Sequence, residues 1–326
     1  MEYAQREHDS ARRGAVSARF GSGEYQYELV TSWPKIEIPG GVADVACDSV
    51  GRVYAGVRDR QADGKPGNIL GGGGHVLVLD RDGNLLNTWE HQFSAPHGVW
   101  IGPNGTVFVA GTGTHTITKH APSGELLLTL GTPGQTGDPG APFNMPTHAV
   151  EAPNGDILVS DGYGQNRVHR FSASGELILS FGGGDSVFLP RRFGTGDASG
   201  TPGTDPCQFN VPHDVYVDAD SQVYVLDREN DRWQVFNLDG ELQSICTGLH
   251  HPNKVVVDGS GRFHLVSMGG VEIREPDGTF VGRWGEQGSG PGQFVATVHG
   301  GWIDDADALY TAEAGIINRL QKFARV

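Results

Sequence analysis

An internal repeat of roughly 40 residues constrains the fold of this chain more than any other feature of its sequence. The clearest copy reads VPHDVYVDADSQVYVLDRENDRWQVFNLDGELQSI and begins at Val211. Similar copies begin at Ala95, Met145 and His251, a looser one precedes them, and a sixth, shorter copy ends the chain. Since a repeat of this length is one supersecondary unit, the whole chain must be read as a ring or an array of such units.

Each copy contains four short runs rich in Val, Ile, Leu, Phe and Tyr, as β-strands are. Polar turns such as Asn154-Gly155 and Asp239-Gly240 separate these runs, and this pairing favours tight hairpins because Asn and Asp tolerate positive φ. Four strands per repeat are typical of a propeller blade. The sequence therefore predicts an all-β, six-bladed β-propeller built from four-stranded antiparallel blades.

The domain boundaries follow from the copy count. Residues 21–326 are expected to form a single propeller domain, and the polar residues 1–20 a flexible tail without the apolar stretch of a signal peptide. The last copy supplies only about three strands. We expect a strand near residues 25–33 to complete it, because a closed ring leaves no unpaired edge.

Charge and cysteine content exclude some classes of partner and indicate a cellular location. The formal net charge is −15, which argues against nucleic acid or an anionic membrane as a partner. No apolar run approaches the roughly 18 residues of a membrane span. The three cysteines show no CxxC spacing, so reduced thiols and a cytoplasmic location are expected.

Three histidines occupy one register of the repeat. In each copy, the residue that closes the second strand serves as a reference point. The residue fourteen places before it is called the register position. The register positions are Ala43, His97, Thr147, His213, Asn253 and His299. Since first strands line the channel of a propeller, imidazoles from alternate blades should converge on its axis. Three imidazoles with an open position are typical of catalytic zinc, although other divalent transition metals accept them too.

Two further histidines lie near that register. His148 stands one position and His251 two positions away from it. A single histidine in a β-protein is more often a hydrogen-bonded structural residue than a ligand. We therefore expect both to be polar groups beside turns, with lining of the channel as the alternative.

The loops after the second strands return to the face that carries the three histidines. They place Tyr163, Arg58 and Arg228 at the rim of the expected metal site. A tyrosine beside a cation can serve as a base, and an arginine offers a fork for a carboxylate. The structural alternatives are that Tyr163 packs on its loop, that Arg58 pairs with Asp59 or Asp44, and that Arg228 pairs with Glu229 or with a neighbouring blade. Glycine-rich connections at 131–143 and 182–207, and an insertion at 59–74, are candidate covers on the same face.

The segments SDGYGQNRVHRFSASGELILSFG and CQFNVPHDVYV with the later VLDREN resemble the six-bladed lyase domain of peptidyl-α-hydroxyglycine α-amidating lyase, within the NHL-repeat group. The resemblance implies zinc on His97, His213 and His299, Tyr163 near the substrate hydroxyl, and Arg58 at the substrate carboxylate. A second family arginine falls near Arg228. The implied reaction cleaves an N-acyl-α-hydroxyglycine into an amide and glyoxylate, with zinc polarising the hydroxyl and Tyr163 taking its proton.

The departures from the family pattern refine this expectation. Gly164 replaces a family cysteine, so the disulfide near it is lost, and Thr297 replaces a methionine. Gly300 replaces an aspartate tied to structural calcium, which argues against structural Ca²⁺ here. No counterpart of the copper monooxygenase domain is found, so a related small carbinolamine or hydroxy acid bearing a carboxylate is the expected small-molecule substrate.

Two other functions remain open from the sequence. One is a metal-dependent hydrolase such as a propeller lactonase, a class that gathers Glu, Asn and Asp around calcium; Asn253 is the only such residue in the register. The other is a metal-free NHL module that binds a protein partner with its rim. The oligomeric state is not determined by the sequence.

Overall fold

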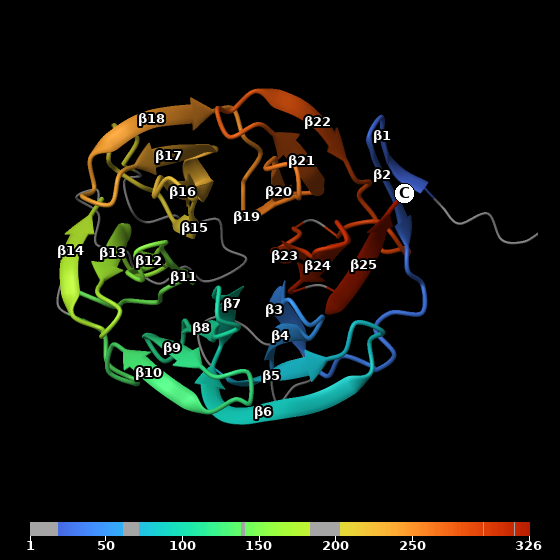
Figure 1. Cartoon of the computed structure of the whole chain (residues 1–326), viewed down its shortest axis with the longest axis horizontal. Coiled ribbons are helices and arrows are strands. Elements are labelled where there is room, and N and C mark those ends of the chain that lie inside the picture. Colours follow the sequence, from blue (N-terminus) through green and yellow to red (C-terminus); the bar gives the residue numbers. More distant parts are fainter. Residues whose placement is uncertain (1–18, 61–71, 138–140, 183–202, 296, 316) are drawn as a thin grey trace, which may run out of the picture.

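The computed structural model describes residues 19–326 with the exception of 61–71, 138–140, 183–202, 296 and 316. Six antiparallel sheets stand radially around a central axis, as Figure 1 shows. This arrangement confirms the all-β, six-bladed propeller predicted from the repeat. Each blade is one copy of the repeat, and the sixth blade also contains the N-terminal strands.

The strands of each blade follow one another from the axis outward. Blades 1 and 2 comprise β3 (Gly41–Cys47), β4 (Val53–Arg58), β5 (Gly73–Leu79) and β6 (Leu85–Ser94), then β7 (Pro96–Ile101), β8 (Val107–Gly111), β9 (Thr116–His120) and β10 (Leu126–Leu130). Blades 3 and 4 comprise β11 (His148–Glu151), β12 (Ile157–Asp161), β13 (Arg167–Phe171) and β14 (Leu177–Phe181), then β15 (Pro212–Val217), β16 (Val223–Asp227), β17 (Arg232–Phe236) and β18 (Leu242–Thr247). Blades 5 and 6 comprise β19 (Lys254–Val257), β20 (Phe263–Ser267), β21 (Gly270–Arg274) and β22 (Phe280–Trp284), then β23 (Gly300–Ile303), β24 (Leu309–Glu313), β25 (Arg319–Arg325), β2 (Tyr25–Leu29) and β1 (Arg19–Ser22).

The hydrophobic core is distributed around the ring. Six apolar clusters each fill the space between two adjacent blades. The second strands are buried along their whole length because blades cover both of their faces, and this explains their continuous runs of apolar residues. The fourth strands lie on the outside and expose much of their surface.

The end of each second strand fixes the register of the site. Five of these strands end at the residues used for the alignment, namely Gly111, Asp161, Asp227, Ser267 and Glu313. In blade 1 the aligned residue is Val57, fourteen places after the register position Ala43, and β4 continues one residue beyond it, to Arg58. The difference arises because β4 and β5 remain paired as far as Arg58 and Gly74.

The two ends of the described chain meet in blade 6. Strand β2 pairs antiparallel with β25, placing Tyr27 opposite Arg325, and β1 adds a fifth strand beyond it. Figure 1 shows β1 and β2 beside β25. Arg19 and Phe20 belong to β1, so the tail predicted for residues 1–20 is two residues too long; residues 1–18 lie outside the described part. Phe20 is held by ring contacts with Trp284 and Phe323 at 6.5 and 5.6 Å between centroids.

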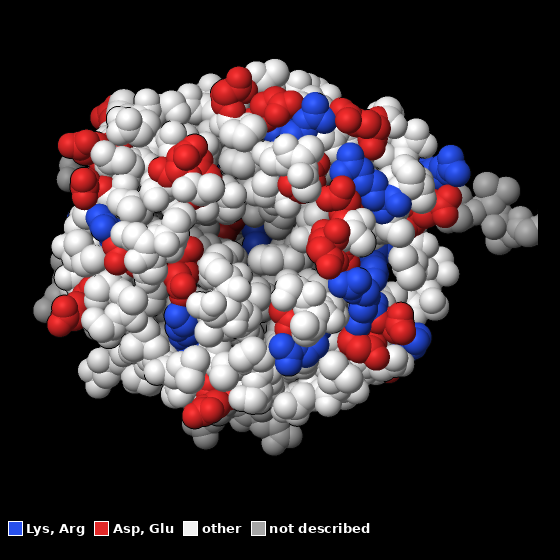
Figure 2. Space-filling model, in the orientation of Figure 1, with Lys and Arg blue, Asp and Glu red and all other residues white. Residues whose placement is uncertain are grey.

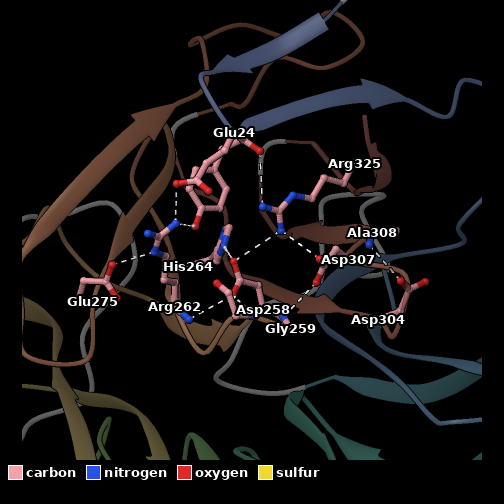
Figure 3. A network of polar contacts seen from close by, with 12 residues as sticks. Glu24, Asp258, Gly259, Arg262, His264, Glu275, Asp304, Asp307, Ala308 and Arg325 are labelled. Atoms are coloured by element: carbon pink, nitrogen blue, oxygen red, sulfur yellow. Dashed lines mark hydrogen bonds and ion pairs between the residues drawn. The ribbon is translucent and has the colours of Figure 1, made fainter.

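A polar network fastens this closure, as Figure 3 shows. Arg262 donates to Glu24 and to the Tyr25 hydroxyl, both at 2.6 Å, and to Glu275 at 2.8 Å. The arginine therefore links blade 5 to the N-terminal hairpin that completes blade 6.

Arg325 forms the second link in the same network (Figure 3). It donates to Asp307 at 3.0 Å and lies 3.7 Å from Asp258, which in turn accepts a hydrogen bond from His264 at 3.0 Å. Asp258 lies in the turn between β19 and β20, so this contact joins blade 5 to the last strand of the chain.

Acidic and basic side chains lie mostly around the rim of the face shown in Figure 2, and the molecule is hollowed at the centre of the disc. Among the described residues, no helix has the length and apolar character that crossing a bilayer requires. All three cysteines are free thiols, with Cys47 buried and Cys207 exposed.

Candidate metal centre

The three register histidines meet on the axis. His97 and His213 lie at the start of β7 and β15, and His299 immediately precedes β23. One ligand atom from each lies within 4.8 Å of the others, and their ring centroids are 4.5 to 5.0 Å apart. His97 and His213 are buried and His299 is half-buried.

Backbone carbonyls orient all three rings in the same way. The Nδ1 atoms of the histidines lie 2.6 to 2.7 Å from carbonyl oxygens, and these belong to the register residues of the blades in between, Thr147, Asn253 and Ala43. A carbonyl oxygen only accepts, so each Nδ1 carries the hydrogen and each Nε2 lone pair remains available. Burial holds the pKa of each imidazole well below its usual range, which keeps the rings neutral. A carbonyl on the second ring nitrogen is the typical support of a metal-binding histidine.

Tyr163 closes the site from the loop after β12. Its buried hydroxyl oxygen lies 3.0 Å from His97 Nε2 and 2.9 Å from His213 Nε2. Met145 and Val211 pack against it in a small apolar cluster. The phenol has one proton and can donate to one of these nitrogens only. Three imidazole lone pairs and a phenol oxygen thus converge, and only one hydrogen is available among these four atoms. A cation would satisfy such a set of ligand atoms.

Arg228 contacts the tyrosine from the short 3-10 helix η2 (Arg228–Asn230). Its Nη1 donates to the Tyr163 hydroxyl oxygen at 3.3 Å, and Glu229 accepts from its Nε and Nη2 at 3.2 and 2.9 Å. Burial acts to lower the pKa of Arg228, but the Tyr163 and Glu229 side chains outweigh it and the pKa is raised. Arg228 therefore pairs with Glu229, as its structural alternative predicts, and also contacts the tyrosine.

Arg58 is the second buried cation of the site. Its Nε donates to Pro96 O at 3.0 Å, and its Nη2 has no hydrogen-bond partner among the described residues. Burial lowers its pKa to about 10, so it still carries its charge near neutral pH. A buried guanidinium with an unused N–H group suits an anionic ligand.

Acidic side chains anchor the segments that lead into the first strands of blades 3 and 4. Asp161 accepts from Asn144 N with both carboxylate oxygens, and Asp227 accepts from Asn210 N at 2.6 Å. These carboxylates end the second strands of blades 3 and 4, so they tie each entering segment to its own blade.

A charged layer that sequence reasoning missed lies one residue further along the first strands. Lys254 of blade 5 donates to Asp44 Oδ2 at 2.5 Å and to Val99 O at 3.1 Å. Asp44 also accepts from the backbone N–H groups of Val99 and Gly301 at 2.8 and 3.2 Å. Lys254 and Asp44 therefore join four blades across the axis. The aligned repeat carried the signal, as a run of charged residues and glycines immediately after the register position.

His148 belongs to this layer, so its assignment as a polar group beside a turn is wrong. It is buried in the channel with Nδ1 2.6 Å from Asp214 Oδ1. Gly98 and Gly300 make room for the layer, because a Cβ at Gly98 would overlap His148 and one at Gly300 would overlap Asp44. A small polar cavity lined by the histidines and by this layer lies between the two.

His251 lies outside the channel, as its placement beside a turn predicts. Its Nε2 is 3.4 Å from Glu229 and its backbone N–H donates to Asp231.

Most residues of the candidate covers cannot be placed, because 61–71, 138–140 and 183–202 lie outside the described residues. Gly164 packs so closely on Asn144 that a Cβ would overlap it, which accounts for glycine at this point of the tyrosine loop.

Comparisons with known proteins place the chain among propellers of this kind. No family model matches it. It is 31% identical over 264 residues to NHL repeat-containing protein 3 of Homo sapiens, covering 74% of this chain and 67% of the relative. It is 32% identical over 165 residues to a probable peptidyl-α-hydroxyglycine α-amidating lyase of Caenorhabditis elegans, covering 50% of this chain and 43% of that protein.

A solved structure described as a gluconolactonase from Xanthomonas campestris superposes with a TM-score of 0.61, covering 95% of this chain and 92% of that one. The identity is 16%, so this likeness shows the shared fold alone. The match to the human NHL protein extends over most of both chains. The chain therefore belongs to the NHL-repeat family of six-bladed β-propellers, and the amidating lyases are among its relatives.

Proposed function

We propose that this protein is a zinc-dependent lyase that cleaves the C–N bond of a small carbinolamine bearing a carboxylate. The observation that carries the proposal is the convergence of three oriented, neutral imidazoles on one tyrosine hydroxyl. The kinship with an amidating lyase supports the reaction type.

His97, His213 and His299 would hold the metal through Nε2. A zinc ion at these nitrogens supplies a Lewis acid that lowers the pKa of a nearby hydroxyl group. The carbonyl partners on Nδ1 support this assignment, because they fix both the tautomer and the direction of each ring.

Tyr163 is placed to move the proton of the reaction. In the proposed step its Oη takes the proton of the substrate hydroxyl while the carbon–oxygen bond becomes a carbonyl. The C–N bond breaks, its electron pair goes to nitrogen, and nitrogen receives a proton. An N-acyl-α-hydroxyglycine is thereby converted to an amide and glyoxylate, with atoms and charge balanced. Arg228 donates to Tyr163 Oη at 3.3 Å and so helps to hold the hydroxyl in place beside the histidines.

Arg58 would bind the carboxylate of the substrate. Its charge is buried and its Nη2 is unpartnered within the described residues, so an anion entering the site gains a charge-assisted hydrogen bond. Arg228 has Glu229 as its own counter-ion, which makes Arg58 the better carboxylate ligand of the two.

The direct test is release of glyoxylate from α-hydroxyhippurate by the zinc-loaded protein. Stoichiometric glyoxylate and benzamide are expected, with loss of activity after chelation and recovery on adding zinc. Hydrolysis of gluconolactone in place of this reaction would assign the site to a lactonase. Absence of bound metal and of both activities would make the chain a binding module.

A further inference from the structure

The central channel has a second mouth on the face opposite the histidines. A cavity of about 500 Å³, counting solvent space at its opening, is lined by residues near the ends of the first strands, such as Tyr216 and Val257. The metal-site residue His213 and the cavity-wall residue Tyr216 both belong to β15. Tyr216 lies three residues further along this strand, or roughly 10 Å at about 3.3 Å per residue. The charged layer, which follows the histidine register by one residue, separates the cavity from the metal centre.

The walls of this cavity are apolar and aromatic. Trp100, Tyr216 and Trp302 come from blades 2, 4 and 6, and valines and an isoleucine fill the spaces between them. The two tryptophans and the tyrosine are only partly buried. Such walls suit a flat or branched apolar group, because aromatic side chains offer large contact areas to it.

The floor is polar and built from the charged layer. Lys254 and His148 both line the cavity and are more than nine-tenths buried. Two of the three N–H groups of Lys254 go to Asp44 and Val99, which leaves one for a ligand. His148 Nε2 has no hydrogen-bond partner among the described residues. Asp44 Oδ2 lies 3.9 Å from this nitrogen.

The charges around the floor select a neutral head group. An anionic head would lie near the carboxylates of Asp44 and Asp214, which contact the two floor side chains, and a cationic head would face the ammonium of Lys254. A primary carboxamide can accept from Lys254 through its oxygen and donate to His148 Nε2 through its nitrogen. It thus satisfies both floor groups without adding charge.

We propose that this opposite mouth of the channel is a binding site for small neutral carboxamides with an aromatic or branched apolar body. The apolar body lies between Trp100 and Trp302, and the amide contacts Lys254 and His148. The site requires no metal and is independent of the reaction proposed for the other face.

Benzamide is the probe, and the indole N–H signals of Trp100 and Trp302 in the full chain are the readout, assigned with single Trp→Phe variants. Titration is expected to shift both signals saturably. Benzoate and benzylammonium are expected to bind at least about fivefold more weakly, a cost of about 1 kcal/mol. Equal binding of benzoate would overturn the neutral head group, and no shift with benzamide would overturn the site.

Variants separate this cavity from the metal centre. Val257→Trp fills the cavity from its wall, and His148→Phe removes the floor nitrogen; each is expected to weaken benzamide binding at least about tenfold. Val217→Trp is the matched control, because Val217 ends the equivalent strand of blade 4 but does not line the cavity. His213→Ala is expected to leave the shifts intact. Unchanged affinity in Val257→Trp, or loss of the shifts in His213→Ala, would contradict the proposal.

Discussion

At the scale of single residues, each register histidine uses its two nitrogens for different tasks. Nδ1 binds a carbonyl of the next blade and Nε2 points to the axis, where Tyr163 already contacts two of the three. The sequence could predict that His97, His213 and His299 meet, since the repeat fixed their depth. It could not predict the carbonyl partners, because these are backbone atoms of residues with unrelated side chains.

Replacing Tyr163 with Phe removes the proposed proton acceptor and leaves the three imidazoles in place. We expect kcat for glyoxylate release to fall by about 10²- to 10⁴-fold, the usual contribution of a positioned acid–base group. Zinc content, measured on the same preparation, should remain that of the wild type. Full activity in this variant would remove Tyr163 from the mechanism.

Arg58→Lys keeps the positive charge but loses the planar fork that suits a carboxylate. We expect KM to rise about tenfold or more with a smaller change in kcat, because binding of the carboxylate weakens. Arg81→Lys provides the control, since Arg81 pairs with Asp305 on the exposed surface. An unchanged KM for Arg58→Lys would mean that another group holds the carboxylate.

At the scale of elements, the four strands of each repeat could be predicted from the sequence, but the additional strand at the N-terminal end could not. Five of the six second strands end where the alignment placed them, because buried apolar runs and turn residues define them jointly. Strand β1, with the sequence RFGS, has no such pattern and exists because Phe20 packs on Trp284 and Phe323. A contact of this kind, between residues far apart in sequence, leaves no local signal.

The turn between β19 and β20 should make the closure of the ring sensitive to acid. Burial acts to raise the pKa of Asp258, but hydrogen bonds from His264 and Ser260 outweigh it, so the pKa lies below its usual range. A depressed carboxyl pKa stabilises the fold above the unfolded-state pKa of about 4, and this contribution is lost as pH falls.

Asp258→Ala should therefore lower the free energy of unfolding by about 3 kcal/mol at pH 7 and by less at pH 3. Urea denaturation at both pH values measures the difference. Asp220→Ala, in the equivalent turn of blade 4, is exposed and should change stability little. If Asp258→Ala loses as much free energy of unfolding at pH 3 as at pH 7, the charge of Asp258 does not cause the loss.

At the scale of the whole molecule, the blades are joined by apolar clusters around the ring and by one charged layer across it. The repeat predicted the ring, since six copies admit few other architectures. The charged layer escaped prediction because Asp44 and Lys254 lie 210 residues apart and belong to blades that are not neighbours. The long side chain of Lys254 reaches the Asp44 carboxylate directly, and the missing Cβ of Gly300 leaves room for that carboxylate.

Lys254→Met tests that cross-ring link. The substitution leaves the buried carboxylate of Asp44 without its ammonium partner, and we expect a loss of about 3–5 kcal/mol of stability. Adding Asp44→Asn to the same chain should restore part of the loss, because no buried charge is then uncompensated. Additive losses in the double variant would show that the two side chains are not coupled.

Metal content of the purified chain tests the central claim most directly. Elemental analysis is expected to find one zinc per chain in the wild type and in His250→Ala, whose exposed imidazole lies outside the channel. His97→Ala, His213→Ala and His299→Ala should each lose the metal while retaining the β-sheet circular dichroism and a cooperative unfolding transition. A wild-type protein that takes up no stoichiometric metal, or ligand variants that keep it, would contradict the account.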